Sequence, residues 1–311
     1  MLKFVVRRIA WTVPVLLLVI LMTFVMMQMI KGNPFQTSER GVPESIQRNL
    51  ERQFHLDKPW YLQYAYYVRD VFTFNLGPSM RQRNRDVNDI IKEQFPVSLK
   101  LGGLAMLFAI VVGIPLGLIA ALRQNTWADY SAMAVVNAGY ALPNFLIATL
   151  LIYFFALKWG AHTPFPTNGW AGWESWVLPM IALGHQPMTV LARIVRGSML
   201  ETLQQDYIRT AKSKGLRWRR VIGLHVLRNS LIPAVTAAAP LLGSLIAGSF
   251  IVETIFGIPG IGRYFIISVQ SRDYSVTMGI TVLLSVIIIA ANLLVDVLYG
   301  YLDPRTRDVR T

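Results

Sequence analysis

Six apolar stretches, each about as long as a helix that crosses a lipid bilayer, dominate the sequence. A helix rises about 1.5 Å per residue, so about 20 residues cross about 30 Å of hydrocarbon. With 54% hydrophobic and only 15% charged residues among 311, the chain has more apolar surface than a soluble core could bury. The sequence therefore predicts an all-α integral membrane protein. The expected transmembrane helices are Ile9–Ile30, Leu99–Leu122, Ser131–Leu157, Val177–Ile194, Leu231–Val252 and Thr277–Leu298.

The distribution of Lys and Arg predicts how these spans are oriented. The net charge is +13, but the basic residues lie between long apolar runs and form no single patch, so a nucleic-acid partner is not expected. If six helices cross the membrane, three basic segments fall on the same side: the N-terminus, the stretch Arg193–Arg228 and the C-terminal tail. That side is cytoplasmic by the positive-inside rule. We expect a multi-pass protein with both termini in the cytoplasm.

The segment 31–96 is too long for a simple connection, and we expect it to be a mostly helical extracytoplasmic insert. Prolines 43, 59 and 96 indicate helices at Glu44–Phe54, Trp60–Phe72 and Val87–Phe95. This divides the chain into an N-terminus with the first anchor (1–30), the insert (31–96) and a core with five spans (97–311). Aromatic residues of the insert form either an interfacial belt or a docking surface: Trp60, Tyr61, Tyr64, Tyr66 and Tyr67.

The sequence offers no energy source of its own. It has no G-x-x-x-x-G-K-[ST] loop and no Gly-Lys dipeptide, so ATP hydrolysis is not expected in this chain. A proton-coupled carrier would need titratable groups deep in the bilayer, but Glu253 and Asp296 lie near span ends and only His185 lies within a predicted span. With no cysteine and four scattered histidines, a metal site is not expected either.

The cytoplasmic loop 196–230 carries a more specific pattern. A short helix is predicted over Tyr207–Lys214, with Asp206 as its cap and Gly215 as a left-handed stop. Tyr207, Ile208 and Ala211 would share one face. A small apolar face among basic residues suits the groove of another protein.

The run DYIRTAKSKGLRWRRVIGLHVLRNSLIP (206–233) resembles the EAA loop of binding-protein-dependent ABC importers. Further segments, including MLKFVVRRIAWTVPVL, HLDKPWYLQY, FPVSLKLG, ETIFGIPGIG and VDVLYGYLDP, are similar to the B-type permease subunit of oligopeptide and dipeptide importers. The resemblance implies the permease arrangement of a type I ABC importer in the inner membrane. It also implies that the loop docks on an ATPase subunit, the alternative being a loop that only sets topology. The docking residues that it implies are Tyr207, Arg209, Thr210, Ala211, Lys212 and Gly215.

The resemblance implies partners as well. These are a second, homologous permease subunit in a heterodimer, two ATP-binding subunits that hold ATP and magnesium, and an extracytoplasmic peptide-binding protein. This chain itself would bind no cofactor. Oligopeptides or dipeptides are the implied substrates, with nickel or glutathione as alternatives within the family. A proton-coupled secondary carrier and a membrane-bound signalling scaffold are the alternatives outside it.

Polar and small residues in spans three to five predict a passage, because such groups are tolerated at membrane depth only against protein or a wet cavity. The alternative is ordinary helix packing, which we also expect for Gly113 and Gly117 of span two. The predicted pathway residues are Asn137, Asn144, His185, Gln186, Ser244 and Ser249. After span five, a Gly-rich turn near residues 256–262 is expected at the outer surface. The residues expected on the binding-protein side, or alternatively as salt-bridge partners that stabilise the loop, are Glu253, Arg263, Arg272 and Asp273.

Overall fold

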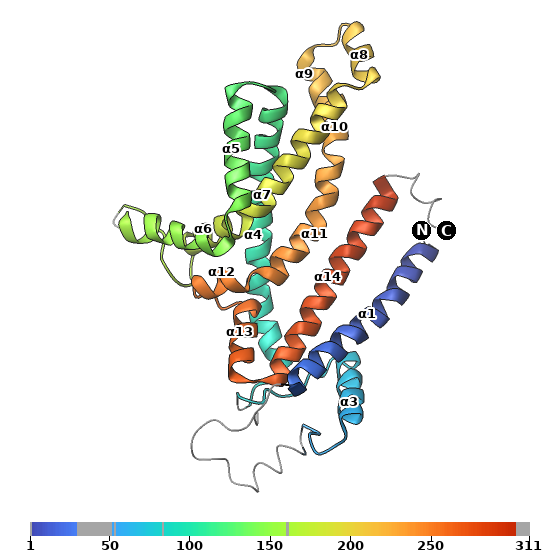
Figure 1. The fold of residues 1–311 in the computed structure, drawn as a ribbon, viewed down its shortest axis with the longest axis vertical. Helices are drawn as coiled ribbons and strands as arrows, with labels where there is room; N and C mark the ends of the chain where they lie inside the picture. Colours follow the sequence, from blue (N-terminus) through green and yellow to red (C-terminus); the bar gives the residue numbers. More distant parts are fainter. Residues whose placement is uncertain (1, 30–51, 53, 83, 160–161, 303–311) are drawn as a thin grey trace. The chain divides into compact units, whose positions relative to one another are not determined.

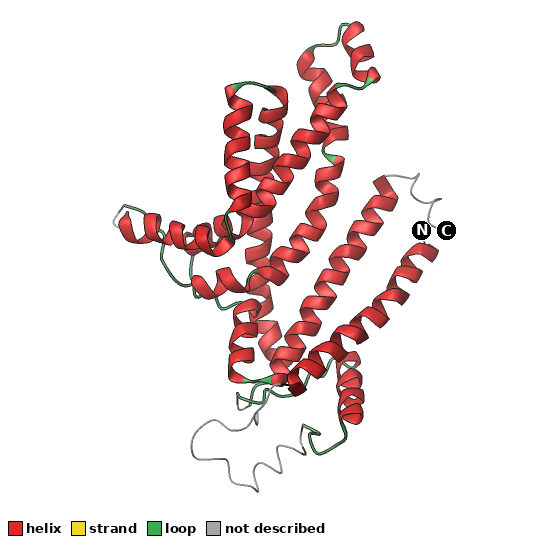
Figure 2. Ribbon diagram, in the orientation of Figure 1, coloured by secondary structure: helices red, strands yellow, loops and turns green. Residues whose placement is uncertain are grey.

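The computed structural model describes residues 2–29, 52, 54–82, 84–159 and 162–302. Regular structure in these residues is helical, apart from an isolated bridge between Pro78 and Asp86 (Figure 2). The long helices are α1 (Leu2–Met29), α4 (Val87–Leu122), α5 (Trp127–Ala141), α7 (Glu174–Leu203), α11 (Ile232–Gly248) and α14 (Tyr274–Leu302). The shorter ones are α3 (Trp60–Phe72), α6 (Asn144–Leu151), α8 (Asp206–Ser213), α9 (Trp218–Val221), α10 (Leu227–Ser230), α12 (Phe250–Ile255), α13 (Ile261–Ser271) and two π-helical segments, η1 (Ile152–Lys158) and η2 (Ile222–Val226).

The chain forms two compact units. One, the core unit, comprises Leu99–Ile258 and Ala290–Thr311, and the other, the N-terminal unit, comprises Leu2–Ser98 and Pro259–Ile289. The predicted boundaries at residues 30 and 96 concern the side of the membrane on which each segment lies. Compactness does not test that property, so those boundaries stay a prediction.

In the N-terminal unit, α1 packs against α3. The Tyr64 hydroxyl donates to the Leu17 carbonyl (3.0 Å), and the amides of Gln28 and Gln63 lie 2.8 Å apart. A second cluster forms where the first turns of α4 meet α13 and α14. Its fully buried members are Val87, Ile90, Ile261, Val276 and Ile280.

In the core unit, α7 is the central helix and contacts α5, α6, α10, α11 and α12. It also lies very close to α4, because glycines remove the side chains that would separate them. A Cβ atom on Gly113 would stand 2.5 Å from the Met188 carbonyl oxygen, and one on Gly117 would collide with the Ala192 carbonyl. The predicted helix contact at Gly113 and Gly117 is therefore confirmed.

The expected spans are met in part. Three helices of the described residues are long and apolar enough to cross a membrane, over Ala10–Met29, Val87–Leu122 and Tyr274–Val295. Two bent pairs would raise the number to five: Trp127–Ala141 with Asn144–Lys158, and Trp218–Ser230 with Ile232–Ala247. The predicted span Val177–Ile194 lies inside α7, which extends from Glu174 to Leu203 and continues through Pro179 and Pro187.

The predicted span Ser131–Leu157 is not one continuous helix, because the chain bends by 107° between Ala141 and Asn144; the bent pair can still count as one span. Pro143 has no N–H and forces the residue before it out of the helical region, and Leu142 accordingly adopts an extended conformation (φ −91°, ψ 126°). Figure 1 shows α6 turning sharply away from α5. The bend leaves the Leu142 carbonyl available to another partner.

The predicted insert helices have three different outcomes. The helix Trp60–Phe72 is confirmed with the same bounds, whereas Glu44–Phe54 lies almost wholly outside the described residues. A separate helix over Val87–Phe95 is wrong, because α4 continues through Pro96 to Leu122. Proline at that point removes one helical hydrogen bond, but the packing of Val87, Ile90 and their neighbours holds the preceding turns in place.

Candidate functional site

The short basic helix predicted in the loop is present as α8, which follows α7 after only two residues, Gln204 and Gln205 (Figure 1). Asp206 is its first residue and makes no side-chain cap, contrary to the prediction. Its carboxylate is exposed and lies 3.7 Å from Arg209 one turn on. Gly215 adopts the left-handed conformation (φ 77°) and its N–H bonds to the Lys212 carbonyl, so the predicted stop is confirmed.

The two faces of α8 differ from the prediction. Ile208 and Ala211 are buried (0% and 7% exposed), so they pack α8 against other parts of this chain. They do not offer an apolar face to a partner. α8 contacts α9, where Val221 is buried as well. The exposed face carries Tyr207, Arg209, Thr210 and Lys212, followed by the exposed Gly215.

Two contacts fix α8 to the helices that follow it. The Asn229 amide donates to the Tyr207 hydroxyl (2.9 Å), and the Lys212 ammonium lies 4.4 Å from the centre of the Trp218 ring. α8 is thus a basic helix attached at both ends, to α7 before it and to α9 and α10 after it. Sequence analysis missed Trp218 and Asn229, although an aromatic next to basic residues is a usable signal.

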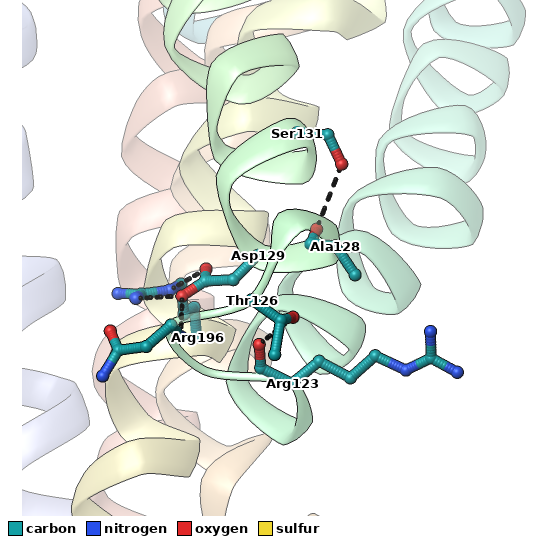
Figure 3. Close-up of polar contacts among 7 residues, drawn as sticks. Arg123, Thr126, Ala128, Asp129, Ser131 and Arg196 are labelled. Atoms are coloured by element: carbon teal, nitrogen blue, oxygen red, sulfur yellow. Dashed lines mark hydrogen bonds and ion pairs between the residues drawn. The ribbon is translucent and has the colours of Figure 1, made fainter.

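Deeper in the core unit, two arginines of α7 bind α5. Arg196 makes two hydrogen bonds of 2.9 Å to the two carboxylate oxygens of Asp129, in a parallel fork (Figure 3). Arg193 donates to the Asn137 side-chain oxygen (2.9 Å) and lies 4.3 Å from the centre of the Tyr140 ring. Sequence analysis assigned both arginines to the basic stretch that sets the topology. It did not single out Asp129, which precedes the expected start of span three at Ser131.

Among the predicted pathway residues, His185 is buried. Its Nδ1 lies 2.9 Å from the Ala182 carbonyl oxygen and its Nε2 lies 3.0 Å from the Leu142 carbonyl oxygen. The ring therefore joins α7 to the bend between α5 and α6. Asn144 lies at the same bend, and its buried side-chain oxygen accepts no hydrogen bond from any residue that the structure describes. Gln186 is half-buried.

The two serines of the pathway prediction have different surroundings. Ser244 is exposed on α11 and donates to the Leu241 carbonyl (2.7 Å). Ser249 is buried and donates to the Glu253 carboxylate (2.5 Å). Glu253 was predicted on the binding-protein side, but its side chain is fully buried in this chain. A pathway through these residues stays a prediction.

Asp273, also predicted on the binding-protein side, organises the N-terminal unit from inside. It is 2% exposed and accepts hydrogen bonds from the Ser79 hydroxyl and from the backbone N–H groups of Met80 (3.1 Å) and Val276 (3.3 Å). It therefore caps α14 and holds the loop before α4 through hydrogen bonds. Asp273 stabilises the loop as the alternative expects, but by a different contact from the expected salt bridge. Arg272 is exposed in a left-handed conformation (φ 58°), and Arg263 is half-buried.

The N-terminal unit also contains a cavity of about 450 Å³ between α1, α3 and the start of α14. Two tyrosines that line it, Tyr67 and Tyr274, have buried hydroxyls that find no hydrogen-bond partner among the described residues. Burial raises the pKa of the Tyr67 phenol, and the charge of Asp70 raises it further, so the group stays protonated.

The sequence matches known transport proteins over nearly its whole length. Residues 113–308 match the family described as the inner membrane component of binding-protein-dependent transport systems, and residues 1–102 match its N-terminal part. The chain belongs to this family. As a member of it, the chain is an inner-membrane, multi-pass transport component.

Individual family relatives cover the chain from end to end. The dipeptide transport system permease protein of Bacillus subtilis is 45% identical over 99% of this chain and 98% of the relative. The oligopeptide transport system permease protein of Salmonella typhimurium is 40% identical over 99% of this chain and all of the relative. The dipeptide permease protein of Escherichia coli is 37% identical over 99% of each.

Solved structures share the fold at low sequence identity. An amino acid ABC transporter chain covers 70% of this chain and 94% of its own length, with a TM-score of 0.53 and 17% identity. A chain of a methionine ABC transporter in an inward-facing conformation covers 67% of this chain with the same TM-score. These structures support the permease fold of an ABC importer and say nothing of the substrate.

Proposed function

We propose that this chain is the B-type permease subunit of an ABC importer that moves oligopeptides or dipeptides across the inner membrane. The observation that carries the proposal is the end-to-end identity of 37–45% with dipeptide and oligopeptide permeases. Because the match runs through the loops as well as the helices, it extends to the segments that contact partner proteins.

The proposed topology has six spans with both termini in the cytoplasm. They are the three long apolar helices, the two bent pairs and α7, which is more polar and is the fourth span in chain order. Exposed apolar side chains on the long helices support a lipid surface: Trp11 on α1, Val111 on α4, Val135 on α5 and Leu294 on α14 are each more than half exposed. In this orientation α8 faces the cytoplasm.

The proposed mechanism is alternating access driven from outside the chain. A binding protein delivers the peptide to the extracytoplasmic mouth, and two ATPase subunits that hold ATP and magnesium push on the exposed basic face of α8. Among the described residues, no group of three His, Asp or Glu side chains that could bind a metal is present. A second permease subunit completes the passage, for which Asn137, Asn144, His185, Gln186, Ser244 and Ser249 remain the candidates.

Uptake by the reconstituted complex tests this function. The chain is co-expressed with the partner subunits of its host, placed in proteoliposomes with internal ATP, and supplied with binding protein and a radiolabelled dipeptide or pentapeptide. We expect uptake that requires both ATP and the binding protein, with no competition from excess nickel or glutathione. Uptake that survives ATP removal and disappears with a protonophore would identify a secondary carrier, and competition by nickel or glutathione would identify another substrate class.

A further inference from the structure

The ion pair between Asp129 and Arg196 joins two helices at a point where each leads to a different functional element. Arg196 lies in the last two turns of α7, ten positions before Asp206, the first residue of α8. Asp129 lies in the first turn of α5, which ends at the bend beside Pro143. The pair therefore connects the helix that carries α8 to the helix that leads to the bend.

The geometry makes this connection stiff. The Asp129 side chain is 3% exposed and that of Arg196 is 27% exposed, so the pair is largely shielded from water and salt. The carboxylate receives two guanidinium hydrogen bonds, and a third comes from the backbone N–H of Asn125 (3.1 Å). Asn125 holds a left-handed conformation (φ 61°), so the carboxylate also fixes the turn between α4 and α5.

A second attachment lies further along the same two helices. Arg193, three positions before Arg196, binds Asn137 and lies over Tyr140. Beyond it, His185 contacts the Leu142 carbonyl at the bend itself. α5 and the bend that follows it are thus joined to α7 at three levels.

We propose that Asp129 and Arg196 form the joint that transmits movement of α8 to α5, and so couple ATP hydrolysis in the partner subunits to opening of the passage. Both are positioning residues, because they bind each other and would act on the passage through the helices that carry them. A charged fork suits this role better than apolar contact, because its two parallel hydrogen bonds fix direction as well as distance. The proposal rests on the proposed function of the chain as an importer permease.

The test measures coupling in the complete complex. The variants are D129N, R196Q and R196K, and the control is R123Q. Arg123 lies in the turn between α4 and α5, and its side chain is exposed and points away from the ion pair (Figure 3). Each complex is assayed for retained ATPase subunits, for ATP hydrolysis with and without peptide-loaded binding protein, and for peptide uptake.

We expect D129N and R196Q to retain the ATPase subunits and the unstimulated hydrolysis rate, but to lose stimulation and uptake about tenfold or more. R196K should lie between these variants and the unaltered complex, because it keeps the charge but loses the fork. The exchange D129R/R196D should restore part of the stimulation, whereas R123Q should match the unaltered complex.

Stimulation and uptake in D129N and R196Q equal to those of R123Q would overturn the proposal. So would a proportional fall in unstimulated and stimulated rates, or loss of assembly in both R196Q and R196K, because each would assign the pair to folding alone. Failure of the proposed function looks different, since the unaltered complex would then show no peptide-stimulated hydrolysis.

Discussion

At the scale of single residues, two tyrosines one turn apart on α3 have opposite surroundings. The Tyr64 hydroxyl donates to the Leu17 carbonyl of α1, whereas the Tyr67 hydroxyl is buried beside the cavity with no partner in the part of the chain that the structure describes. A buried polar group stabilises a fold only when it is paired, so the same atom should have opposite effects at the two positions.

Tyr64→Phe should therefore lower the stability of the purified protein by about 1 kcal/mol, and Tyr67→Phe should leave it unchanged or raise it. Thermal unfolding of both variants in the same detergent measures the difference. Each variant is the control for the other, because both remove one hydroxyl from the same helix. Equal destabilisation by the two changes would show that Tyr67 has a polar partner or ligand in the cavity.

At the scale of elements, the sequence predicted what depends on local chemistry. The bounds of α3, the left-handed stop at Gly215 and the helix contact at Gly113 and Gly117 follow from short-range patterns. Two features could not be predicted, because they depend on neighbours that are far apart in the sequence. They are the burial of Ile208 and Ala211, and the ion pair between Asp129 and Arg196. Pro143 marks a break in span three at the sequence level, but the 107° angle of the bend depends on how α6 packs against α7 and α12.

The contact between α4 and α7 gives a prediction at this scale. Gly113→Ala should destabilise the protein by about 1–3 kcal/mol, because its methyl group would overlap backbone of α7 that cannot move easily. Gly103→Ala in the same helix is the matched control, since nothing lies within 4 Å of the added methyl group. Gly103→Ala should stabilise the protein slightly, because alanine has a higher helix propensity than glycine. Thermal unfolding measures both, and a Gly113→Ala protein as stable as Gly103→Ala would show that the helices are not in close contact.

At the scale of the whole molecule, each of the two compact units has its own buried contacts. The N-terminal unit is organised around Asp273 and the cluster of Val87, Ile90 and Ile280. The core unit is organised around α7, which makes contact with most of its helices and leads directly into α8. In the proposed importer, the core unit thus supplies the path along which force from the ATPase subunits reaches the membrane helices.

In the proposed mechanism this permease receives its energy through the exposed basic face of α8, and one reversal of charge tests this role most directly. Arg209 is exposed on that face, and Arg123 is exposed on the turn between α4 and α5. Peptide uptake and retained ATPase subunits are measured in complexes that carry Arg209→Glu or, as a control with the same change of charge, Arg123→Glu. We predict that Arg209→Glu lowers both at least about tenfold, as expected for a charge reversed within an interface, and that Arg123→Glu lowers neither. Full uptake and full retention in the Arg209→Glu complex would contradict the account.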